Sequence, residues 1–216
     1  LALPLKRGEG TNVGPALEAF LKKEQQSVAS ADPAKLQQDI RSFQQYRQAA
    51  ITTTIASDQI GVQHLLHYHY HLKTLTKRLA SYESEIKFSF VWSEAFRPNN
   101  RITSGSLALD WGGILWNLAA LESHKGSLID RSTDEGIRNA SLQFQNAAGI
   151  VEFIRSDVTP KILGPKSAEL SNLFLQMITQ LLLAQAQICF YEKAIRDRKT
   201  TGNFKPALIA KLAQQV

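Results

Sequence analysis

The sequence predicts a mainly α-helical protein, an antiparallel helical solenoid or bundle with one small β-strand region near the N-terminus. Apolar residues recur at helical spacing through most of the 216 residues, and short turn-forming stretches separate these periodic segments. The clearest change to a period of two is IKFSFVW at 86–92. With a hydrophobic content of 44%, the chain can bury a core, and we expect residues 1–216 to form a single domain.

The first eighty residues predict three helices. The opening LALPLKR alternates weakly, as a short strand does. Pro15 suits the first turn of the first helix. Asp32 can cap a second helix, on which Ile40, Phe43 and Arg47 recur on successive turns. A third helix is expected from about 58 to 79.

After the predicted strand at 86–92, the pattern is helical to the end. A helix over about 107–125 contains Gly112 and Gly113, which weaken a helix, so we expect close approach of a neighbouring helix there. Thr133 caps the next helix, and Ser167 caps a long one that reaches about residue 199. The stretch TTGN turns the chain into a last helix that has no stop signal before residue 216.

The stretch HLLHYHYH at 64–71 raises the question of a metal site. On a helix, His64, His67 and His71 share one side, while His69 points elsewhere. Zinc requires a third or fourth ligand, and the run contains no Asp, Glu or Cys. The favoured interpretation places these imidazoles at the surface of an amphipathic helix, with Leu65, Leu66, Leu72 and Leu75 on its buried side.

The sequence contains none of the motifs that would predict a cofactor or a catalytic centre. There is no G-x-G-x-x-G, G-x-x-x-x-G-K-[ST], G-x-S-x-G or C-x-x-C. The neighbouring carboxylates Glu83 and Glu85, and Asp134 and Glu135, are interpreted as charged surface. We therefore expect no catalytic residues, no metal and no cofactor.

Charge and cysteine content favour a cytosolic protein without nucleic-acid binding. The net charge of +6 is small, and the basic residues are scattered rather than interleaved with aromatics. The single cysteine, Cys189, fits a reducing compartment. The apolar run at 173–190 is interrupted by several polar residues, so we interpret it as a buried helix rather than a membrane span.

Four stretches resemble the Bro-one (BRO) domain of the Alix family. They are FVWSEAF at 90–96, GILWNLAALES at 113–123, FQNAAGIVEFI at 144–154, and LAQAQICFYEKAIRDR at 183–198 with the following ALIAKL. The resemblance implies a curved antiparallel helical solenoid with tetratricopeptide-like helix pairs and a small β-sheet region. That family's domain is longer, so we expect this chain to be the truncated front part of one.

The resemblance also implies a function and a set of contact residues. It implies a cytoplasmic, non-catalytic adaptor that is recruited to endosomes and binds the C-terminal amphipathic helix of an ESCRT-III subunit of the charged-multivesicular-body-protein type. Such adaptors act in multivesicular-body sorting and membrane scission. The implied apolar contacts are Phe190, Leu208 and Leu212. The implied polar contacts are Asp134, Arg138, Lys193 and Lys211.

Hairpin geometry supports a groove at these positions. If the chain reverses near Thr201, antiparallel helices bring Phe190 beside Leu212 and Ala194 beside Leu208. The small Ala194 then leaves a depression that a visiting helix could occupy. In the alternative interpretation, Phe190, Leu208 and Leu212 are ordinary core residues between neighbouring helices.

A second functional hypothesis is a peripheral membrane-binding module that recognises anionic lipid. Lys193, Arg196, Arg198 and Lys199 form a small basic cluster. Each basic residue near an anionic membrane surface contributes about 1 kcal/mol. This hypothesis and the adaptor hypothesis are compatible with each other.

Overall fold

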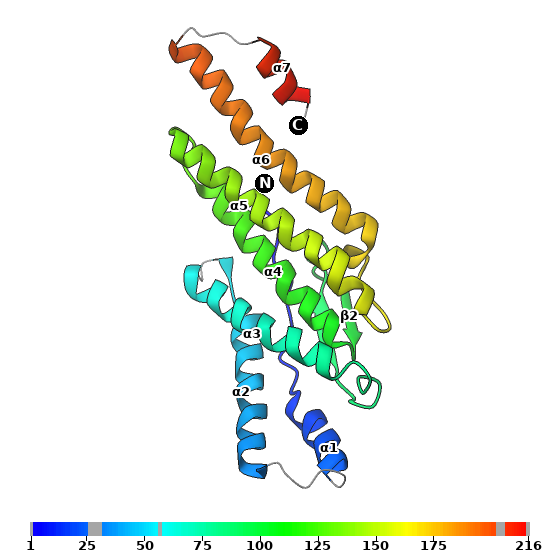
Figure 1. Cartoon of the computed structure of the whole chain (residues 1–216). Helices are drawn as coiled ribbons and strands as arrows, with labels where there is room; N and C mark the ends of the chain where they lie inside the picture. Colours follow the sequence, from blue (N-terminus) through cyan, green and yellow to red (C-terminus); the bar gives the residue numbers. More distant parts are fainter. Residues whose placement is uncertain (1, 26–31, 56–57, 202–205, 215–216) are drawn as a thin grey trace.

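The computed structural model describes residues 2–25, 32–55, 58–201 and 206–214. The helices stack one after another along an elongated molecule, from α1 and α2 at one end to α7 at the other (Figure 1). The α-helices are α1 (Gly14–Gln25), α2 (Pro33–Ile51), α3 (Asp58–Arg78), α4 (Leu107–Leu128), α5 (Asp134–Phe153), α6 (Asn172–Thr201) and α7 (Pro206–Gln214). The predicted mainly α-helical class is therefore confirmed.

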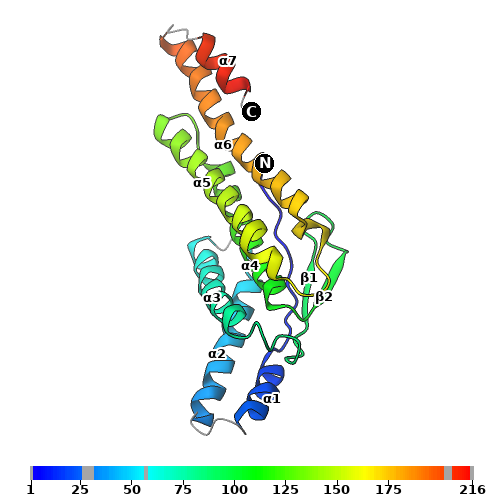
Figure 2. The same ribbon diagram turned by 45° about the vertical axis from the view of Figure 1, so that its right-hand side comes forward.

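Helix α4 forms the centre of the molecule. Every residue from Leu107 to Leu121 is buried, because α3 and α5 pack against α4 along the stack and β1 and the N-terminal segment also lie against it (Figures 1 and 2). A helix that is apolar all round belongs in a core, and this one has no polar stripe. The apolar sequence GILWNLAAL within α4 is what makes the stack possible.

The N-terminal residues lie extended along α4 and do not form the predicted strand. The backbone N–H of Leu3 donates to Ser123 Oγ at 2.9 Å, and the N–H of Lys6 donates to Asn117 Oδ1 at 2.7 Å. Asn117 Nδ2 donates in turn to the carbonyl of Lys6 at 3.0 Å. Side chains of α4 thus satisfy backbone groups that a neighbouring strand would otherwise pair, and only a single bridge joins Gly8 to Trp92.

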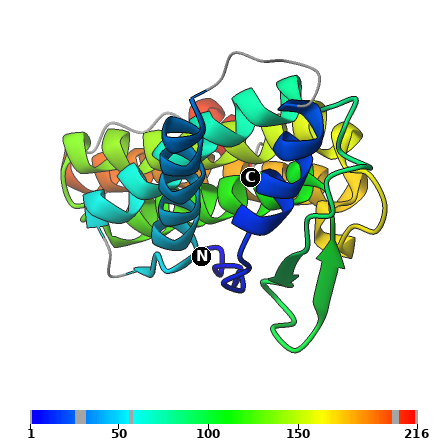
Figure 3. The same ribbon diagram turned by 90° about the horizontal axis from the view of Figure 1, so that it is seen from below.

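A two-stranded antiparallel sheet flanks α4, with β1 (Phe90–Ser93) paired to β2 (Arg101–Ser104) (Figure 3). Ile86, Phe88, Phe90 and Trp92 are buried as their spacing predicts. The strand itself begins at Phe90 rather than at residue 86, and β2 was not predicted. RITS is too short and too polar to show a period of its own, so only its pairing with β1 makes it a strand.

Of the glycine pair in α4, Gly113 is explained by a tryptophan rather than by a neighbouring helix. A Cβ on Gly113 would lie 2.6 Å from Cε2 of Trp92, inside the distance that real Cβ atoms keep. Gly112 is less crowded, since the nearest atom to its Cβ would be Leu170 Cδ1 at 3.5 Å. The expectation of close approach is confirmed at Gly113, but the approaching group comes from β1.

Helix α5 is capped as predicted, with Thr133 Oγ1 accepting from the N–H of Gly136 at 3.0 Å. Beyond Phe153 the helix widens into a π-helical turn, η2 (Ile154–Val158), followed by the 3₁₀ turns η3 (Thr159–Lys161) and η4 (Ala168–Leu170). Ser167 precedes η4, and its side chain caps no helix. The long helix therefore begins at Asn172, four residues after the first position that a cap at Ser167 predicts.

Helix α6 packs one side against α5. The buried residues on that side include Leu175, Ile178, Leu182, Ala186 and Cys189. In the described part of the chain, Asn172–Arg198 is the one helix long and apolar enough to cross a membrane, and a third of that stretch is buried. Length and composition alone are weak evidence for a membrane span, because core helices of soluble proteins have the same properties.

A fully buried charge network joins three elements to α4. Asp110 accepts hydrogen bonds from Arg47 Nε at 3.2 Å and Nη2 at 3.0 Å, from the hydroxyl of Tyr68 at 2.7 Å, and from Trp92 Nε1 at 2.8 Å. Burial disfavours the charged form of Arg47, but Asp110 and Tyr68 together raise its pKa above the ordinary value. Burial, and next the charge of Asp110, raise the pKa of Tyr68. The network therefore holds one ion pair and a neutral tyrosine in the core.

Two carboxylates that bind backbone N–H groups complete the core. Glu169 pairs with Lys6 and accepts from the N–H groups of Ala95 and Phe96, each at 2.8 Å. Burial lowers the pKa of Lys6, although Glu169 offsets part of the effect. Glu83, predicted to be charged surface, is buried and accepts from the N–H of Leu107 at the start of α4. The prediction for Glu83 was wrong because its partner lies 24 residues away in the sequence.

Candidate partner-binding surface

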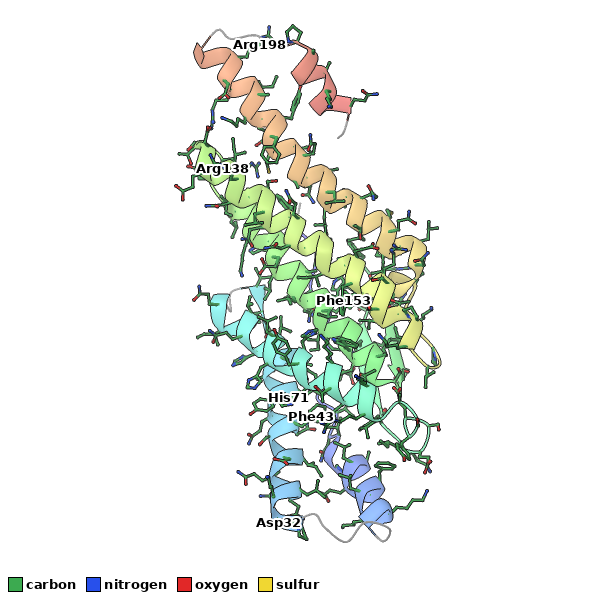
Figure 4. The ribbon with its side chains drawn as sticks, in the orientation of Figure 1. Asp32, Phe43, His71, Arg138, Phe153 and Arg198 are labelled. Atoms are coloured by element: carbon green, nitrogen blue, oxygen red, sulfur yellow. The ribbon has the colours of Figure 1, made fainter. Side chains whose placement is uncertain are left out.

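The predicted contact residues lie at the end of the molecule formed by the start of α5, the second half of α6, and α7. Figure 4 shows Arg138 near the start of α5 and Arg198 near the end of α6, both at this end. Helix α7 returns alongside α6, and Ala213 lines a hollow of about 370 Å³ together with Ile188, Tyr191 and Glu192. The predicted antiparallel hairpin is therefore present.

Phe190 lies at the edge of a second hollow, between α5 and α6. It is half-buried and packs against the core. The hollow has a volume of about 490 Å³, and its lining consists of Gln145 from α5 and Gln180, Leu183, Ala184, Ala186, Gln187 and Phe190 from α6. Exposed Leu142 lies on α5, three residues before Gln145. This mixture of apolar and amide side chains is suited to the flank of an amphipathic helix.

Three of the four predicted polar residues are exposed, and Lys193 is partly exposed. Lys193 Nζ donates to Asp134 Oδ2 at 2.5 Å and lies 3.1 Å from Asp197 Oδ2. The hydrogen bond from Lys193 lowers the pKa of Asp134, and the same bond is the main reason that the pKa of Lys193 is raised. The structure thus brings Asp134 and Lys193 together, whereas Arg138 and Lys211 lie on α5 and α7.

Further ion pairs connect the start of α5 to α6, and no sequence pattern predicted them. Arg131 donates a hydrogen bond to each carboxylate oxygen of Glu192, from Nε to Oε2 at 2.7 Å and from Nη2 to Oε1 at 3.3 Å. Arg196 also pairs with Asp134 and donates to the carbonyl of Ser132 at 2.6 Å. Pairs that form between residues about 60 positions apart leave no periodic trace in a sequence.

The apolar anchors on α7 can be placed only by their backbone. Leu208 and Leu212 belong to α7, but their side chains lie outside the described residues. The described part of α7 is exposed at Ala207, Ala210, Lys211 and Ala213. That Leu208 and Leu212 line a groove, rather than lie in the core between helices, therefore stays a prediction.

The basic cluster proposed for anionic lipid is partly neutralised. Lys193 and Arg196 both pair with Asp134, and each also lies within ion-pair distance of Asp197. The side chain of Lys199 lies outside the described residues. Fewer positive charges are thus available to a membrane surface than the sequence suggests, and the lipid hypothesis stays a prediction.

The histidine-rich helix α3 contains no cluster able to hold a metal among the described residues. His67 and His71 stack on Tyr46, with ring centroids 4.3 and 4.8 Å away, and His64 is exposed. His69 accepts from Trp111 Nε1 at 2.8 Å. As predicted, the imidazoles lie at or near the surface, while Leu65 and Leu72 are buried and Leu66 and Leu75 partly so.

Comparison with known proteins establishes the family. A model of the BRO1-like domain matches residues 1–216, the whole chain. The chain belongs to the BRO1-like domain family. This resemblance was expected from the sequence, and the match confirms it.

Two curated proteins that are similar to this chain are much longer than it is. It is 29% identical over 220 residues to the pH-response regulator protein palA/RIM20 of Emericella nidulans, covering 100% of this chain and 24% of the relative. It is 34% identical over 155 residues to the vacuolar protein-sorting protein BRO1 of Gibberella zeae, covering 72% of this chain and 15% of the relative. The BRO1-like domain described here therefore spans a quarter or less of these relatives.

A solved structure described as the ALIX BRO1 CHMP4C complex has the same fold. The TM-score is 0.81 at 25% sequence identity, and the match covers 99% of this chain and 60% of that one. The predicted helical architecture with a small sheet near the N-terminus is therefore confirmed at the level of the fold.

Proposed function

We propose that this BRO1-like domain is a non-catalytic adaptor module that binds the C-terminal amphipathic helix of an ESCRT-III subunit of the charged-multivesicular-body-protein type. In this role the protein is cytoplasmic, is recruited to endosomes, and acts in multivesicular-body sorting and membrane scission. Family membership supports the proposal, as does similarity to a solved structure whose description pairs ALIX BRO1 with CHMP4C.

The observation that carries the proposal is the half-buried Phe190 at the edge of an open hollow between α5 and α6. The Asp134–Lys193 pair and Arg138 lie toward the start of α5, where they can contact polar residues of a bound helix. Leu208 and Leu212 share one face of α7 at a spacing of four residues, and we assign both to the same surface.

The expected affinity is modest. Burying an apolar side chain contributes roughly 1.5 to 3 kcal/mol, and association itself costs several kcal/mol. Three apolar anchors at Phe190, Leu208 and Leu212 therefore support a dissociation constant on the order of micromolar. Such an affinity suits reversible recruitment.

Titration of a fluorescent peptide with the sequence of the CHMP4C C-terminal helix tests the proposal. Fluorescence anisotropy is expected to show micromolar binding to the wild-type chain. Leu208→Asp and Leu212→Asp should each abolish binding, and Phe190→Ala should weaken it about tenfold or more, since its loss removes roughly 1.5 kcal/mol or more of burial. Leu173→Asp is the matched control, because Leu173 is 78% exposed at the opposite end of α6.

Circular dichroism and thermal melting of the same variants decide between groove and core. Melting temperatures near that of the wild type, together with lost binding, support an exposed groove. Melting temperatures that fall sharply in both Leu208→Asp and Leu212→Asp would show that these leucines are core residues, and the proposed surface would be wrong.

A further inference from the structure

A cavity lies away from the candidate partner-binding surface. It has a volume of about 620 Å³, within the range of small-molecule sites. Residues from the end of α3, from α4 and from the turns that follow α5 line it, and we call it the α3–α4 pocket. Its lining includes Lys73, Lys77, Trp111, Phe153, Asp157 and Lys161. Figure 4 shows Phe153 and Arg138 at opposite ends of α5, so the two regions are separate.

The apolar part of the α3–α4 pocket is aromatic. The rings of Trp111 and Phe153 meet edge to face, with centroids 5.8 Å apart. The indole N–H of Trp111 is already bonded to His69, and Trp111 is only 3% exposed, so it offers the pocket a small apolar area and no free donor. Phe153 is only partly buried and offers the larger ring surface. Edge-to-face pairs of this kind accept a further ring at favourable geometry. The lining thus favours a flat aromatic body.

The mouth of the α3–α4 pocket is basic. Lys73 and Lys77 lie four residues apart on α3 and therefore point to the same side, and Lys161 comes from η3 with its Nζ 5.7 Å from the Trp111 ring centroid. None of these three lysines forms an ion pair with a carboxylate of the described residues. Lys161 Nζ also donates a hydrogen bond to the carbonyl oxygen of Asp157. Three exposed lysines around one opening attract an anion.

The two carboxylates of the pocket only partly offset this charge. Glu83 is buried and is engaged by the N–H of Leu107 at the positive end of helix α4. Asp157 is exposed, and its Oδ2 accepts from the hydroxyl of Ser156 at 2.6 Å. The positive charges therefore exceed the negative ones, which favours a ligand with a single negative charge.

A π-helical turn forms one wall of the pocket. Turn η2 follows directly after Phe153 and contains Asp157. Widened turns of this kind are rare, cost stability relative to a regular helix, and occur often at functional sites. Side chains before, within and after this turn, namely Phe153, Asp157 and Lys161, line the same cavity.

We propose that the α3–α4 pocket binds an aromatic monocarboxylate, with its ring against the Trp111–Phe153 pair and its carboxylate among the three lysines. This binding is independent of the partner helix proposed for α5, α6 and α7. The aromatic lining supplies the apolar contact and the basic mouth supplies the selectivity for a negative charge.

Isothermal titration of the chain with naphthalene-2-carboxylate, and with its neutral amide, tests this proposal. The carboxylate is expected to bind saturably with one site per chain, and more weakly as salt concentration rises. The amide should bind about three- to tenfold more weakly. The same loss is expected for the carboxylate with the double variant Lys73→Gln/Lys77→Gln, since each exposed ion pair contributes little.

Two further variants locate the binding. Ala80→Phe places a ring in the pocket from an exposed position outside the helices and should abolish binding without lowering the melting temperature. Lys35→Gln, at the exposed start of α2, removes the same charge far from the pocket and should bind as the wild type does. Absence of saturable binding, equal binding of the amide, or binding that survives Ala80→Phe would each overturn the proposal.

Discussion

At the scale of single residues, Asp110 shows how a core can hold a charge. Its carboxylate accepts four hydrogen bonds, from Arg47, Tyr68 and Trp92, and both Arg47 and Asp110 have fully buried side chains. Burying an ion costs several kcal/mol, which complete hydrogen bonding can offset. The partners lie 63, 42 and 18 residues from Asp110, so the sequence showed only an acid in the first turn of a helix.

Replacing one member of this network should therefore be costly. Asp110→Ala is expected to lower the free energy of unfolding by about 3 to 5 kcal/mol, because Arg47 is left as an unpaired buried charge. The double variant Arg47→Met/Asp110→Leu should lose much less than the sum of the two single changes. Urea denaturation measures both, with Asp39→Ala on the exposed side of α2 as the control. A loss below about 1 kcal/mol for Asp110→Ala would contradict this account.

The histidines on α3 couple stability to pH. Burial and next the charge of Lys73 lower the pKa of His69 below 6.5, and burial followed by His67 lowers that of His71. The neutral form of His69 is the one that accepts from Trp111. The unfolded chain then binds more protons than the folded one below about pH 6.5, so stability falls as the pH drops through that value.

A pH series of urea denaturation checks this expectation. The midpoint for the wild type should be lower at pH 5.5 than at pH 7.5. In the double variant His69→Gln/His71→Gln the difference should shrink, since glutamine does not titrate and its carbonyl can still accept from Trp111. If the wild type and the double variant change equally with pH, these two histidines are not the cause.

At the scale of elements, the periodicity of apolar residues predicted the helices well but missed short strands and turns. The caps at Asp32 and Thr133 are present, because a cap is a local feature of a few residues. Strand β2, turn η2 and the buried position of Glu83 were missed. Strand β2 depends on its pairing with β1, and Glu83 on the N–H of Leu107, 24 residues away, and no local pattern records either partner.

The two glycines of α4 give a matched prediction for one helix. Gly113→Ala would push a methyl group into the ring of Trp92 and is expected to lower the free energy of unfolding by about 1 to 3 kcal/mol. A Cβ at position 112 would lie 3.5 Å from its nearest neighbour, an ordinary contact distance. Gly112→Ala should therefore leave the free energy of unfolding unchanged or raise it by up to about 1 kcal/mol, because alanine favours a helix more than glycine does.

Thermal and urea denaturation of the two glycine variants compare them directly. Gly149→Ala serves as the control, since its Cβ would meet no atom within 4 Å. Equal effects at positions 112 and 113 would mean that Trp92 does not set the requirement for glycine.

At the scale of the whole molecule, the first residues of the chain hold its middle together. The N-terminal segment runs along α4 through hydrogen bonds to Asn117 and Ser123, and Lys6 pairs with Glu169, so the segment connects α4 with η4. The segment looked like a weak strand in the sequence because its alternation is real. Its buried partners are side chains of a helix, which alternation does not specify.

Asn117→Ala tests this connection. The change leaves the N–H and the carbonyl of Lys6 without their partners in a buried place, which should cost about 1 to 3 kcal/mol of unfolding free energy. Hydrogen exchange of the Lys6 amide should accelerate as well. Asn146→Ala, on the exposed side of α5, is the control. If the exchange rate of the Lys6 amide is unchanged in Asn117→Ala, Asn117 does not hold the N-terminal segment against α4.

The candidate site was predictable in part. Family resemblance led to Asp134 and Lys193, which the structure places in contact, and to Phe190, which it places at a hollow. The pairing of Arg131 with Glu192 and the α3–α4 pocket were not predicted, because both arise from elements that meet only in the folded chain. The single-domain boundary and the roles of Leu208 and Leu212 remain predictions.

The length of α6 determines what positions its far end. Its 30 residues correspond to about 45 Å, and ion pairs of Arg131 with Glu192 and of Asp134 with Lys193 and Arg196 connect its second half to the start of α5. Helix α7 follows beyond these pairs. The orientation of the surface where a visiting helix is proposed to dock therefore depends on a few charges at the start of α5, and high salt concentration should loosen that orientation before it unfolds the core.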